Sequence, residues 1–229
     1  MIYTKHNLNK TFFKKQLLYK NNKKPSLYLI SPEKFKLYDF YQELEKVFFT
    51  NAISIFQLRQ KNVTENDLIN NIKELFPLCR KNGVLFILND NPNLVKTFDL
   101  DGVHIGEKDL NISKCRKLIG KNKIIGKSCY NSPNLALKAQ NSGVNYIAFG
   151  AFFKTETKKT FKKVNKNQIK NWKNFKSVPV VGIGGINMFN FKQISQISLD
   201  FYAISSSVWS SKLDSLTYIK KFKNTIDNY

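Results

Sequence analysis

Val178-Pro-Val-Val-Gly-Ile-Gly-Gly185 decides the fold, because it is a continuous apolar run that ends abruptly in glycines. A run that is apolar at nearly every position is typical of a strand buried on both faces of a parallel sheet. Seven other short apolar runs share this character, at residues 26–31, 53–59, 84–90, 102–106, 124–128, 146–150 and 201–206. The sequence therefore predicts eight buried parallel strands.

The segments between these runs have helical spacing. In residues 64–82 the apolar side chains recur at intervals of three and four, and Thr64 and Asp67 resemble a helix-capping pair. Similar patterns predict helices within 132–142 and 188–198 and at the C-terminus, with short helices after the third and fourth strands. A strand followed by a helix eight times predicts an α/β protein with a single (β/α)8 TIM barrel, over residues 26–229. An open doubly wound sheet is the alternative, but no GxGxxG follows the first strand.

The composition is strongly basic, with a formal net charge of +22. Lys and Asn occur throughout the chain, without a zinc-finger spacing or an aromatic-interleaved basic cluster, so we expect no nucleic-acid partner. Residues 1–25 form a basic extension that we expect to cap the barrel; contact with anionic lipid and partial disorder are alternatives. No apolar run approaches the ~20 residues of a membrane span.

The three cysteines, Cys79, Cys115 and Cys129, are far apart and have no metal-ligand spacing. Reduced thiols in a cytoplasmic protein are the simplest interpretation. Cys129 lies at a strand end and could be a nucleophile, but a small buried residue is the favoured role.

Polar side chains gather where the predicted strands end, which is where barrels carry their chemistry. The second strand ends in Gln57, Arg59 and Lys61, three donors that suit an anion. Asp90 and Asp109 follow the third and fourth strands and could share one Mg2+; helix N-capping is the alternative for each. His104, inside the fourth strand, is expected to be a hydrogen-bonded core residue.

A second anion site is predicted after the sixth strand. The loop Gly150-Ala-Phe-Phe-Lys-Thr-Glu-Thr-Lys-Lys159 combines hydroxyls and cations, although an ordinary solvated loop is the alternative. Glycines after the seventh strand and the residues after the eighth commonly form a phosphate site in such barrels. Two anion sites at one barrel mouth predict a reaction between two phosphorylated molecules, or on one molecule with two phosphate groups.

The motifs resemble those of the thiamine phosphate synthase family from about Ser26 to the C-terminus. They are Gln57-Leu-Arg-Gln-Lys61, Asn89-Asp90, Asp101-Gly-Val-His-Ile-Gly106, Asp109, Ile125-Gly-Lys-Ser128, Thr155-Glu-Thr-Lys-Lys159, Val180-Val-Gly-Ile-Gly-Gly-Ile186 and Ile204-Ser205. The chain departs from the family at Glu107, where Gln is usual.

The resemblance implies a Mg2+-dependent cytoplasmic transferase that joins a pyrimidine diphosphate to a thiazole phosphate, as a possible homo-oligomer. It assigns the diphosphate to Gln57, Arg59, Lys61 and Asn89, and Mg2+ to Asp90 and Asp109. Ser128 and Lys158 would also contact the pyrimidine substrate, and Arg59, Lys61, Ser128 and Lys158 would be catalytic. The thiazole phosphate would meet Thr155, Glu156, Thr157, Gly185, Ile204 and Ser205.

Two other functions fit parts of the sequence. A thiazole tautomerase-like relative would share the barrel but would have no use for the diphosphate residues Arg59 and Lys61. A basic barrel that binds nucleic acid without catalysis would use the net charge and would not need carboxylates at its strand ends.

Overall fold

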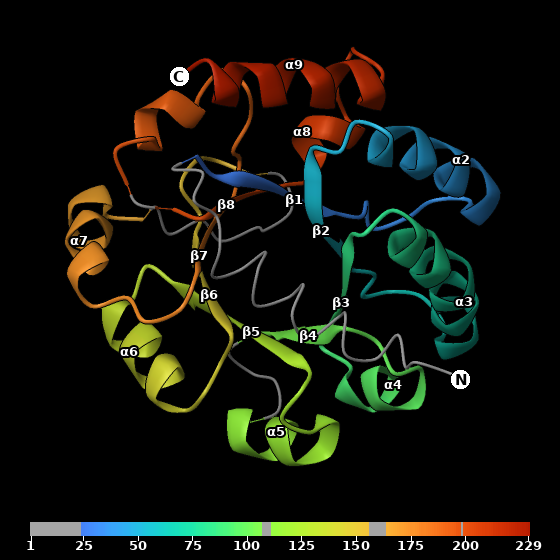
Figure 1. The fold of residues 1–229 in the computed structure, drawn as a ribbon, viewed down its shortest axis with the longest axis horizontal. Helices are drawn as coiled ribbons and strands as arrows, with labels where there is room; N and C mark the ends of the chain where they lie inside the picture. Colours follow the sequence, from blue (N-terminus) through green and yellow to red (C-terminus); the bar gives the residue numbers. More distant parts are fainter. Residues whose placement is uncertain (1–23, 107–110, 156–163, 198) are drawn as a thin grey trace, which may run out of the picture.

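The strands close into one parallel barrel, in the order in which they occur in the chain (Figure 1). The computed structural model describes residues 24–106, 111–155, 164–197 and 199–229. The strands are β1 (Ser26–Ile30), β2 (Ile53–Leu58), β3 (Leu85–Asn89), β4 (Gly102–Ile105), β5 (Ile124–Tyr130), β6 (Tyr146–Gly150), β7 (Val180–Ile183) and β8 (Phe201–Ile204). β8 pairs with β1 to complete the ring. The predicted (β/α)8 barrel is confirmed.

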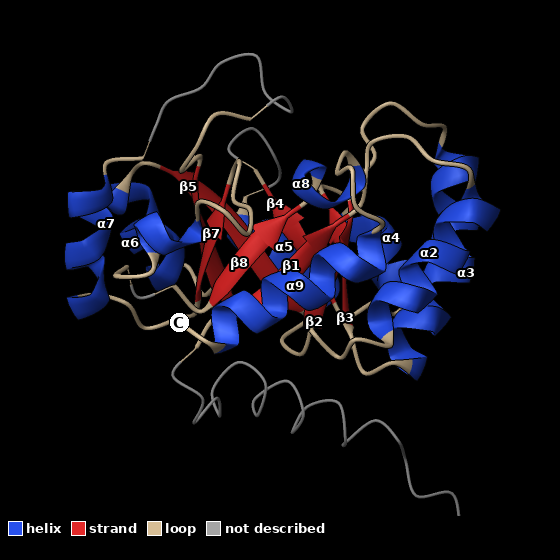
Figure 2. Cartoon of the chain, turned by 90° about the horizontal axis from the view of Figure 1, so that it is seen from above, coloured by secondary structure: helices blue, strands red, loops and turns tan. Residues whose placement is uncertain are grey.

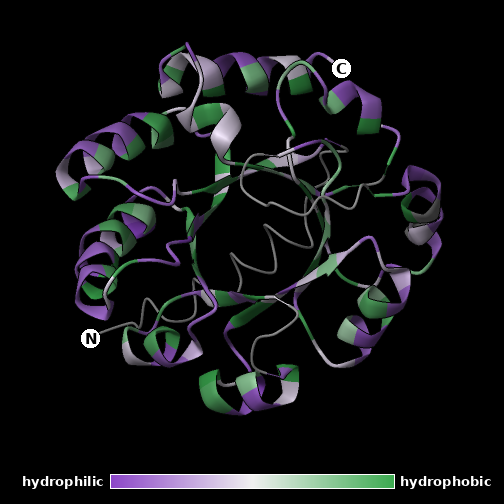
Figure 3. Ribbon diagram, turned by 180° about the vertical axis from the view of Figure 1, so that it is seen from behind, coloured by the Kyte–Doolittle hydropathy of each residue, from purple (hydrophilic) through white to green (hydrophobic). Residues whose placement is uncertain are grey.

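Helices surround the strands on the outside, as the side view in Figure 2 shows. They are α2 (Leu37–Phe48), α3 (Glu65–Lys81), α4 (Pro92–Thr97), α5 (Ile112–Ile119), α6 (Pro133–Asn141), α7 (Lys166–Asn171), α8 (Ser206–Trp209) and α9 (Ser215–Asp227), with the 3-10 turns η1 (Trp172–Asn174) and η2 (Phe191–Ile194). The outer helices each carry both hydrophobic and hydrophilic residues, as expected of helices with one buried face (Figure 3).

Most residues of the strands are apolar, as expected of strands whose two faces are both buried. In β1, Leu27 and Leu29 pack in the layer between the barrel and the helices. Tyr28 and Ile30 point the other way and belong to a separate cluster inside the barrel. The cavity among these inward side chains has a volume of only about 10 Å³, in keeping with a barrel axis that is a packed core rather than a pore.

The predicted helix within 64–82 is confirmed, and the one within 188–198 is wrong. The Thr64 hydroxyl caps α3 by accepting a hydrogen bond from the Asp67 backbone N–H at 3.1 Å. Among the described residues 188–197, only the 3-10 turn η2 forms. The Asn187 side chain accepts hydrogen bonds from the N–H groups of Phe189 and Asn190. Side chains that bind nearby backbone groups in this way compete with helix formation.

At the barrel end where the strands start, polar side chains cap the neighbouring strands. The Asp101 carboxylate accepts a hydrogen bond from the Phe86 backbone N–H at 2.8 Å, and Asp200 binds the Val180 N–H at 2.7 Å. Burial raises the pKa of Asp101 above its ordinary value. Although Asp101 belongs to a motif singled out in the sequence, it therefore holds strands together, and it lies at the opposite end of the barrel from the strand C-termini.

No helix among the described residues is long and apolar enough to cross a membrane. Of the predicted basic extension, residues 1–23 lie outside the described part of the chain.

Candidate active site

Arg59 and Lys61, two of the donors predicted to bind an anion after β2, are both hydrogen-bonded to Glu33. Sequence reasoning missed Glu33. One Glu33 carboxylate oxygen accepts a hydrogen bond from Arg59 Nη1 at 2.9 Å. The other accepts from the Lys61 backbone N–H at 2.7 Å. The Arg59 side chain is only 19% exposed, whereas that of Lys61 is 52% exposed. Glu33 therefore fixes Arg59 and shapes the loop, while Lys61 reaches into solvent at the mouth.

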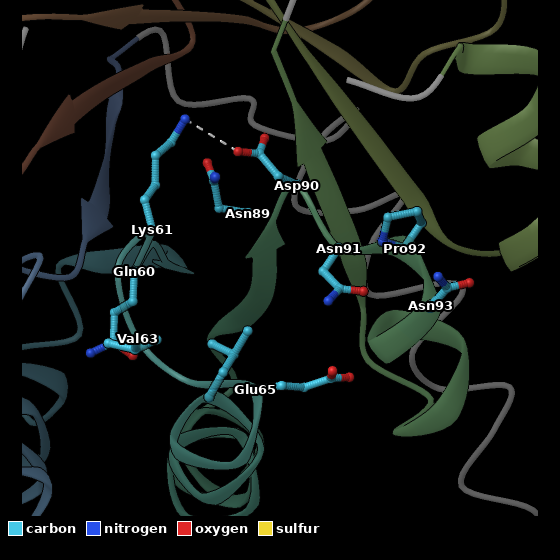
Figure 4. A pocket seen from close by; sticks show the side chains of 10 residues that line it. Gln60, Lys61, Val63, Glu65, Asn89, Asp90, Asn91, Pro92 and Asn93 are labelled. Carbon is cyan, nitrogen blue, oxygen red and sulfur yellow. Dashed lines mark ion pairs between the residues drawn. The ribbon is translucent and has the colours of Figure 1, made fainter. Parts of the chain in front are cut away.

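Lys61 and Asp90 meet at the edge of a pocket beside the mouth (Figure 4). Lys61 Nζ lies 3.4 Å from an Asp90 carboxylate oxygen, and Asn89, the last residue of β3, lies next to them. The pocket has a volume of about 570 Å³ and is lined by Gln60, Lys61, Val63, Glu65, Leu68, Asn89, Asp90, Asn91, Pro92 and Asn93. Three predicted residues, Lys61, Asn89 and Asp90, are thus brought together.

Asp90 is not a helix cap. The side chain of the next residue, Asn91, caps α4 by accepting a hydrogen bond from the Leu94 backbone N–H at 3.1 Å. Asp90 itself has a left-handed backbone, with φ of 60°, and its N–H donates to the His104 carbonyl at 2.9 Å. Left-handed residues other than glycine are uncommon and cluster at functional sites. The capping alternative for Asp90 is excluded, and a role at the mouth is favoured.

Of the two predicted magnesium ligands, the structure describes only Asp90. Asp109, the second predicted ligand, lies outside the described residues, as does Glu107. Within the part of the chain that the structure describes, no three potential ligands gather into a metal-binding cluster. Mg2+ commonly takes only one or two protein carboxylates and completes its shell with water and phosphate oxygens. The Asp90 carboxylate at the mouth therefore suits this ion.

The glycine turn after β7 packs directly against the loop after β6. Gly185 has φ of 66°, and a Cβ there would lie 2.4 Å from the Lys154 carbonyl oxygen. The Phe153 N–H donates to the Gly184 carbonyl at 3.0 Å. Thr155, the next residue of the loop, is half-buried. Glu156, Thr157 and Lys158 were also predicted here and lie outside the described residues.

The residues after β8 lie beside the end of β1. Ile204 ends β8 and is buried, and the Ser205 hydroxyl donates to the Ser31 carbonyl at 3.2 Å. Because all eight strands are parallel, Ser205 and Gly185 lie at the same barrel end as Arg59 and Asp90. The predicted two anion-binding regions therefore share one mouth.

Ser128 and Gln57 lie deeper, on the inner face of the barrel. The Ser128 hydroxyl lies 2.9 Å from His104 Nε2, and Gln57 Nε2 donates to the Tyr28 hydroxyl at 3.0 Å. His104 is buried and hydrogen-bonded, as predicted, with its Nδ1 2.9 Å from the Tyr146 hydroxyl. Sequence reasoning missed Tyr28 and Tyr146. Their inward positions on β1 and β6 follow from strand alternation, but their partners do not.

Cys129 is buried within β5, and burial raises the pKa of its thiol to about 12. Cys79 and Cys115 are also buried. A thiol with such a pKa is protonated at neutral pH and is a poor nucleophile.

We expect native protein to give no rapid reaction with a thiol reagent at pH 8, and unfolded protein to react at all three cysteines. Rapid labelling of Cys129 in native protein would contradict its assignment as a buried, protonated thiol and would favour a role as a nucleophile.

Comparison with known proteins finds relatives that match most of the chain. The family described as thiamine monophosphate synthase matches residues 27–208. The thiamine-phosphate synthase of Pelagibacter ubique is 42% identical over 207 residues, which are 89% of this chain and 100% of that protein. That of Rhodospirillum centenum is 35% identical over 184 residues, covering 80% and 89% of the two chains. A solved structure of thiamine phosphate pyrophosphorylase from Pyrococcus furiosus superposes with a TM-score of 0.78 at 25% identity, covering 90% and 97%.

Proposed function

Because the chain belongs to the thiamine monophosphate synthase family and is a transferase of thiamine phosphate synthesis, we propose how its barrel mouth carries out the reaction. The substrates are 4-amino-2-methyl-5-hydroxymethylpyrimidine diphosphate and hydroxyethylthiazole phosphate, and the products are thiamine phosphate and pyrophosphate. The observation that carries the proposal is the Arg59, Lys61 and Asp90 constellation, which shares one barrel end with the glycine turn at Gly185.

The diphosphate of the pyrimidine substrate is proposed to bind Arg59, Lys61 and Asn89. Arg59 and Lys61 offer a guanidinium and an ammonium group, which form strong charge-assisted hydrogen bonds with phosphate oxygens. Gln57 and Ser128 would contact the pyrimidine part from the inner face of the barrel. Lys61 now pairs with Asp90 at 3.4 Å, so it would exchange this partner for the diphosphate.

Asp90 and Asp109 would hold Mg2+ against the diphosphate. When bound, the ion would neutralise charge that develops on the departing oxygens. A carboxylate beside Lys61 has no evident use in binding an anion alone, because it repels the anion. This consideration supports a metal ion at Asp90.

The proposed chemistry is dissociative. The bond between the pyrimidine methylene carbon and the diphosphate oxygen breaks, and the oxygen keeps the electron pair. Arg59, Lys61 and Lys158 stabilise the departing pyrophosphate, while the pyrimidine ring delocalises the positive charge left on the methylene. The thiazole nitrogen then donates its lone pair to that carbon.

The thiazole phosphate anchors the second substrate and so positions its nitrogen. Thr155, Glu156, Thr157 and Gly185 are proposed to line this phosphate site, with Ile204 and Ser205 closing it. No protein nucleophile enters the scheme, in keeping with the buried thiol of Cys129.

The direct test is pyrophosphate release measured with both substrates and Mg2+, with each substrate alone and a metal chelator as controls. Release only when both substrates and Mg2+ are present is the expected result, with loss in Asp109→Ala. Absence of release from folded protein would contradict the proposal. Isomerisation of a thiazole phosphate by the same sample would then identify a tautomerase-like activity.

Glu33 gives a prediction about loop positioning. Glu33→Ala removes the acceptors for Arg59 and for the Lys61 N–H, and we expect kcat/KM to fall about tenfold, the cost of roughly one lost charge-assisted hydrogen bond. Glu33→Gln keeps one acceptor oxygen in place of two and should lose less activity than Glu33→Ala. Equal losses in the two variants, measured by pyrophosphate release, would show that charge rather than hydrogen bonding is what Glu33 supplies.

A homo-oligomeric state and a cytoplasmic location stay predictions. Light scattering on the purified protein would decide the first.

A further inference from the structure

A continuous chain of hydrogen bonds crosses the interior of the barrel. Gln57 Nε2 donates to the Tyr28 hydroxyl at 3.0 Å, and the Tyr28 and Tyr146 hydroxyls lie 2.9 Å apart. The Tyr146 hydroxyl is 2.9 Å from His104 Nδ1, and His104 Nε2 is 2.9 Å from the Ser128 hydroxyl. These five side chains come from five different strands. The two ends of the chain, Gln57 and Ser128, are both proposed substrate contacts.

The middle of this chain is sealed from solvent. Tyr28 and Tyr146 are 2% and 1% exposed, and His104 is 8% exposed. The adjoining space of about 10 Å³ has room for roughly one water molecule. Burial raises the pKa values of both tyrosines above the ordinary value, so each phenol keeps its proton. A buried hydroxyl donor without an acceptor is costly, so each proton must be placed between two partners.

With the Gln57 amide nitrogen facing Tyr28, these constraints favour one direction of donation along the hydrogen-bond chain. Because the Tyr28 hydroxyl accepts from Gln57, its own hydrogen is directed to the Tyr146 oxygen. The Tyr146 hydrogen then goes to His104 Nδ1, which leaves the His104 proton on Nε2. The Nε2–H group donates to the Ser128 oxygen, so the Ser128 hydrogen is turned away from the histidine. The opposite direction would leave the Tyr28 hydrogen without this acceptor.

We propose that Tyr28, Tyr146 and His104 are positioning residues that fix the Nε2–H tautomer of His104 and thereby make the Ser128 hydroxyl a hydrogen-bond donor to the substrate. The inference rests on the proposed function, since it takes Ser128 as a contact of the pyrimidine diphosphate. The acceptor is a phosphate oxygen or a ring nitrogen of that substrate, because both carry lone pairs. The three residues act through Ser128 and need not touch the substrate themselves.

Gly126 supports the assignment from a different observation. A Cβ at Gly126 would lie 1.9 Å from Cζ of Tyr146 and 2.3 Å from its hydroxyl oxygen. The neighbouring strand thus leaves room for the Tyr146 phenol to reach His104. The glycine in Ile125-Gly-Lys-Ser128 is required by the hydrogen-bond chain rather than by a turn, because it lies inside β5.

The tautomer can be observed directly, because the chain contains only two histidines. Two-bond 1H–15N spectra of a 15N-labelled His6→Gln variant at about pH 8, where an ordinary histidine is neutral, report on His104 alone. The expected pattern is a protonated Nε2 and an unprotonated Nδ1. In Tyr146→Phe this preference should be lost. Tyr202→Phe is the matched control, since Tyr202 is also a buried strand tyrosine but packs outside the barrel interior. A protonated Nδ1 in the His6→Gln variant would overturn the proposal.

A double-mutant cycle tests the path through Ser128. Tyr146→Phe should lower kcat about tenfold with little change in KM, as expected for roughly one lost hydrogen bond. In a Ser128→Ala background the same change should cost less than about twofold, because its effect has already been removed. An undiminished tenfold loss in both backgrounds would show that Tyr146 acts by packing and would overturn the proposal. Thermal unfolding of each variant checks folding.

Failure of this inference differs from failure of the proposed function. An active wild-type enzyme whose His104 carries the proton on Nδ1 refutes the inference alone. A wild-type protein that releases no pyrophosphate refutes the proposed function, whatever the tautomer of His104.

Discussion

Replacing Arg59 by Ala should lower kcat/KM for pyrophosphate release about a thousandfold, which corresponds to about 4 kcal/mol of transition-state stabilisation. The guanidinium is largely buried and is held by Glu33 at 2.9 Å before any substrate binds. A preorganised charge of this kind stabilises the departing pyrophosphate without reorganisation during the reaction. Most of the loss should appear in kcat, because negative charge on the departing oxygens is largest in the transition state. Steady-state rates with both substrates and Mg2+ measure the effect.

The matched control for this change is Arg80→Ala. Arg80 lies near the end of α3, where its guanidinium stacks over the Phe76 ring with 5.6 Å to the ring centroid. It carries the same charge as Arg59 but lies on an outer helix. We expect its removal to leave kcat/KM within about twofold, as is usual for surface substitutions. A comparable loss in both variants would mean that net charge, rather than the position of Arg59, controls the rate.

Replacing Gly185 by Ala should lower kcat/KM for the thiazole phosphate about a hundredfold. The added Cβ would lie 2.4 Å from the Lys154 carbonyl oxygen and 2.9 Å from Phe153 Cβ, so the loop after β6 must move. That loop leads directly into Thr155, a proposed contact of the thiazole phosphate. Misplacement of a substrate by about 1 Å can cost this much in rate. Kinetics with varied thiazole phosphate and saturating pyrimidine diphosphate measure the change.

Gly143→Ala is the control that separates the cost of backbone strain from the cost of the steric clash expected in Gly185→Ala. Gly143 also has a left-handed backbone, with φ of 82°, but a Cβ there would meet nothing within 4 Å. The substitution should cost about 1 kcal/mol of folding stability, as expected for a non-glycine residue in this conformation, with unchanged kinetics. If Gly185→Ala behaved like Gly143→Ala, close packing of the β6 and β7 loops would not be what the thiazole site requires.

Much of the fold could be predicted because periodicity is a local property. The apolar runs predicted all eight strands, and strands buried on both faces need no alternation. The apolar spacing of residues 188–198 predicts a helix, but the side chains of Asn187 and Asn190 take backbone hydrogen bonds into a turn. Such competition by side chains depends on local geometry that spacing does not report.

The site could be predicted in part for a similar reason. Lys61, Asn89 and Asp90 lie at or just after the C-terminal ends of β2 and β3, and the C-terminal ends of adjacent parallel strands lie at the same edge of a sheet. Glu33 lies beyond the end of β1 and could have been found by applying the same rule to the first strand. The position of strand ends does not predict that Glu33 pairs with Arg59, because Lys61 is also nearby and could have been the partner.

The sequence by itself determined the number of strands, their burial and the polar character of their C-terminal ends, because these properties depend on residues close together in the chain. Only the tertiary structure decided which polar groups meet inside the barrel. The Tyr28–Tyr146 hydrogen bond joins residues 118 positions apart, and the His104–Tyr146 bond joins residues 42 positions apart. Closure of the barrel brings these strands around a common axis. Because Gly126 has no Cβ, the Tyr146 phenol can reach its hydrogen-bond partners.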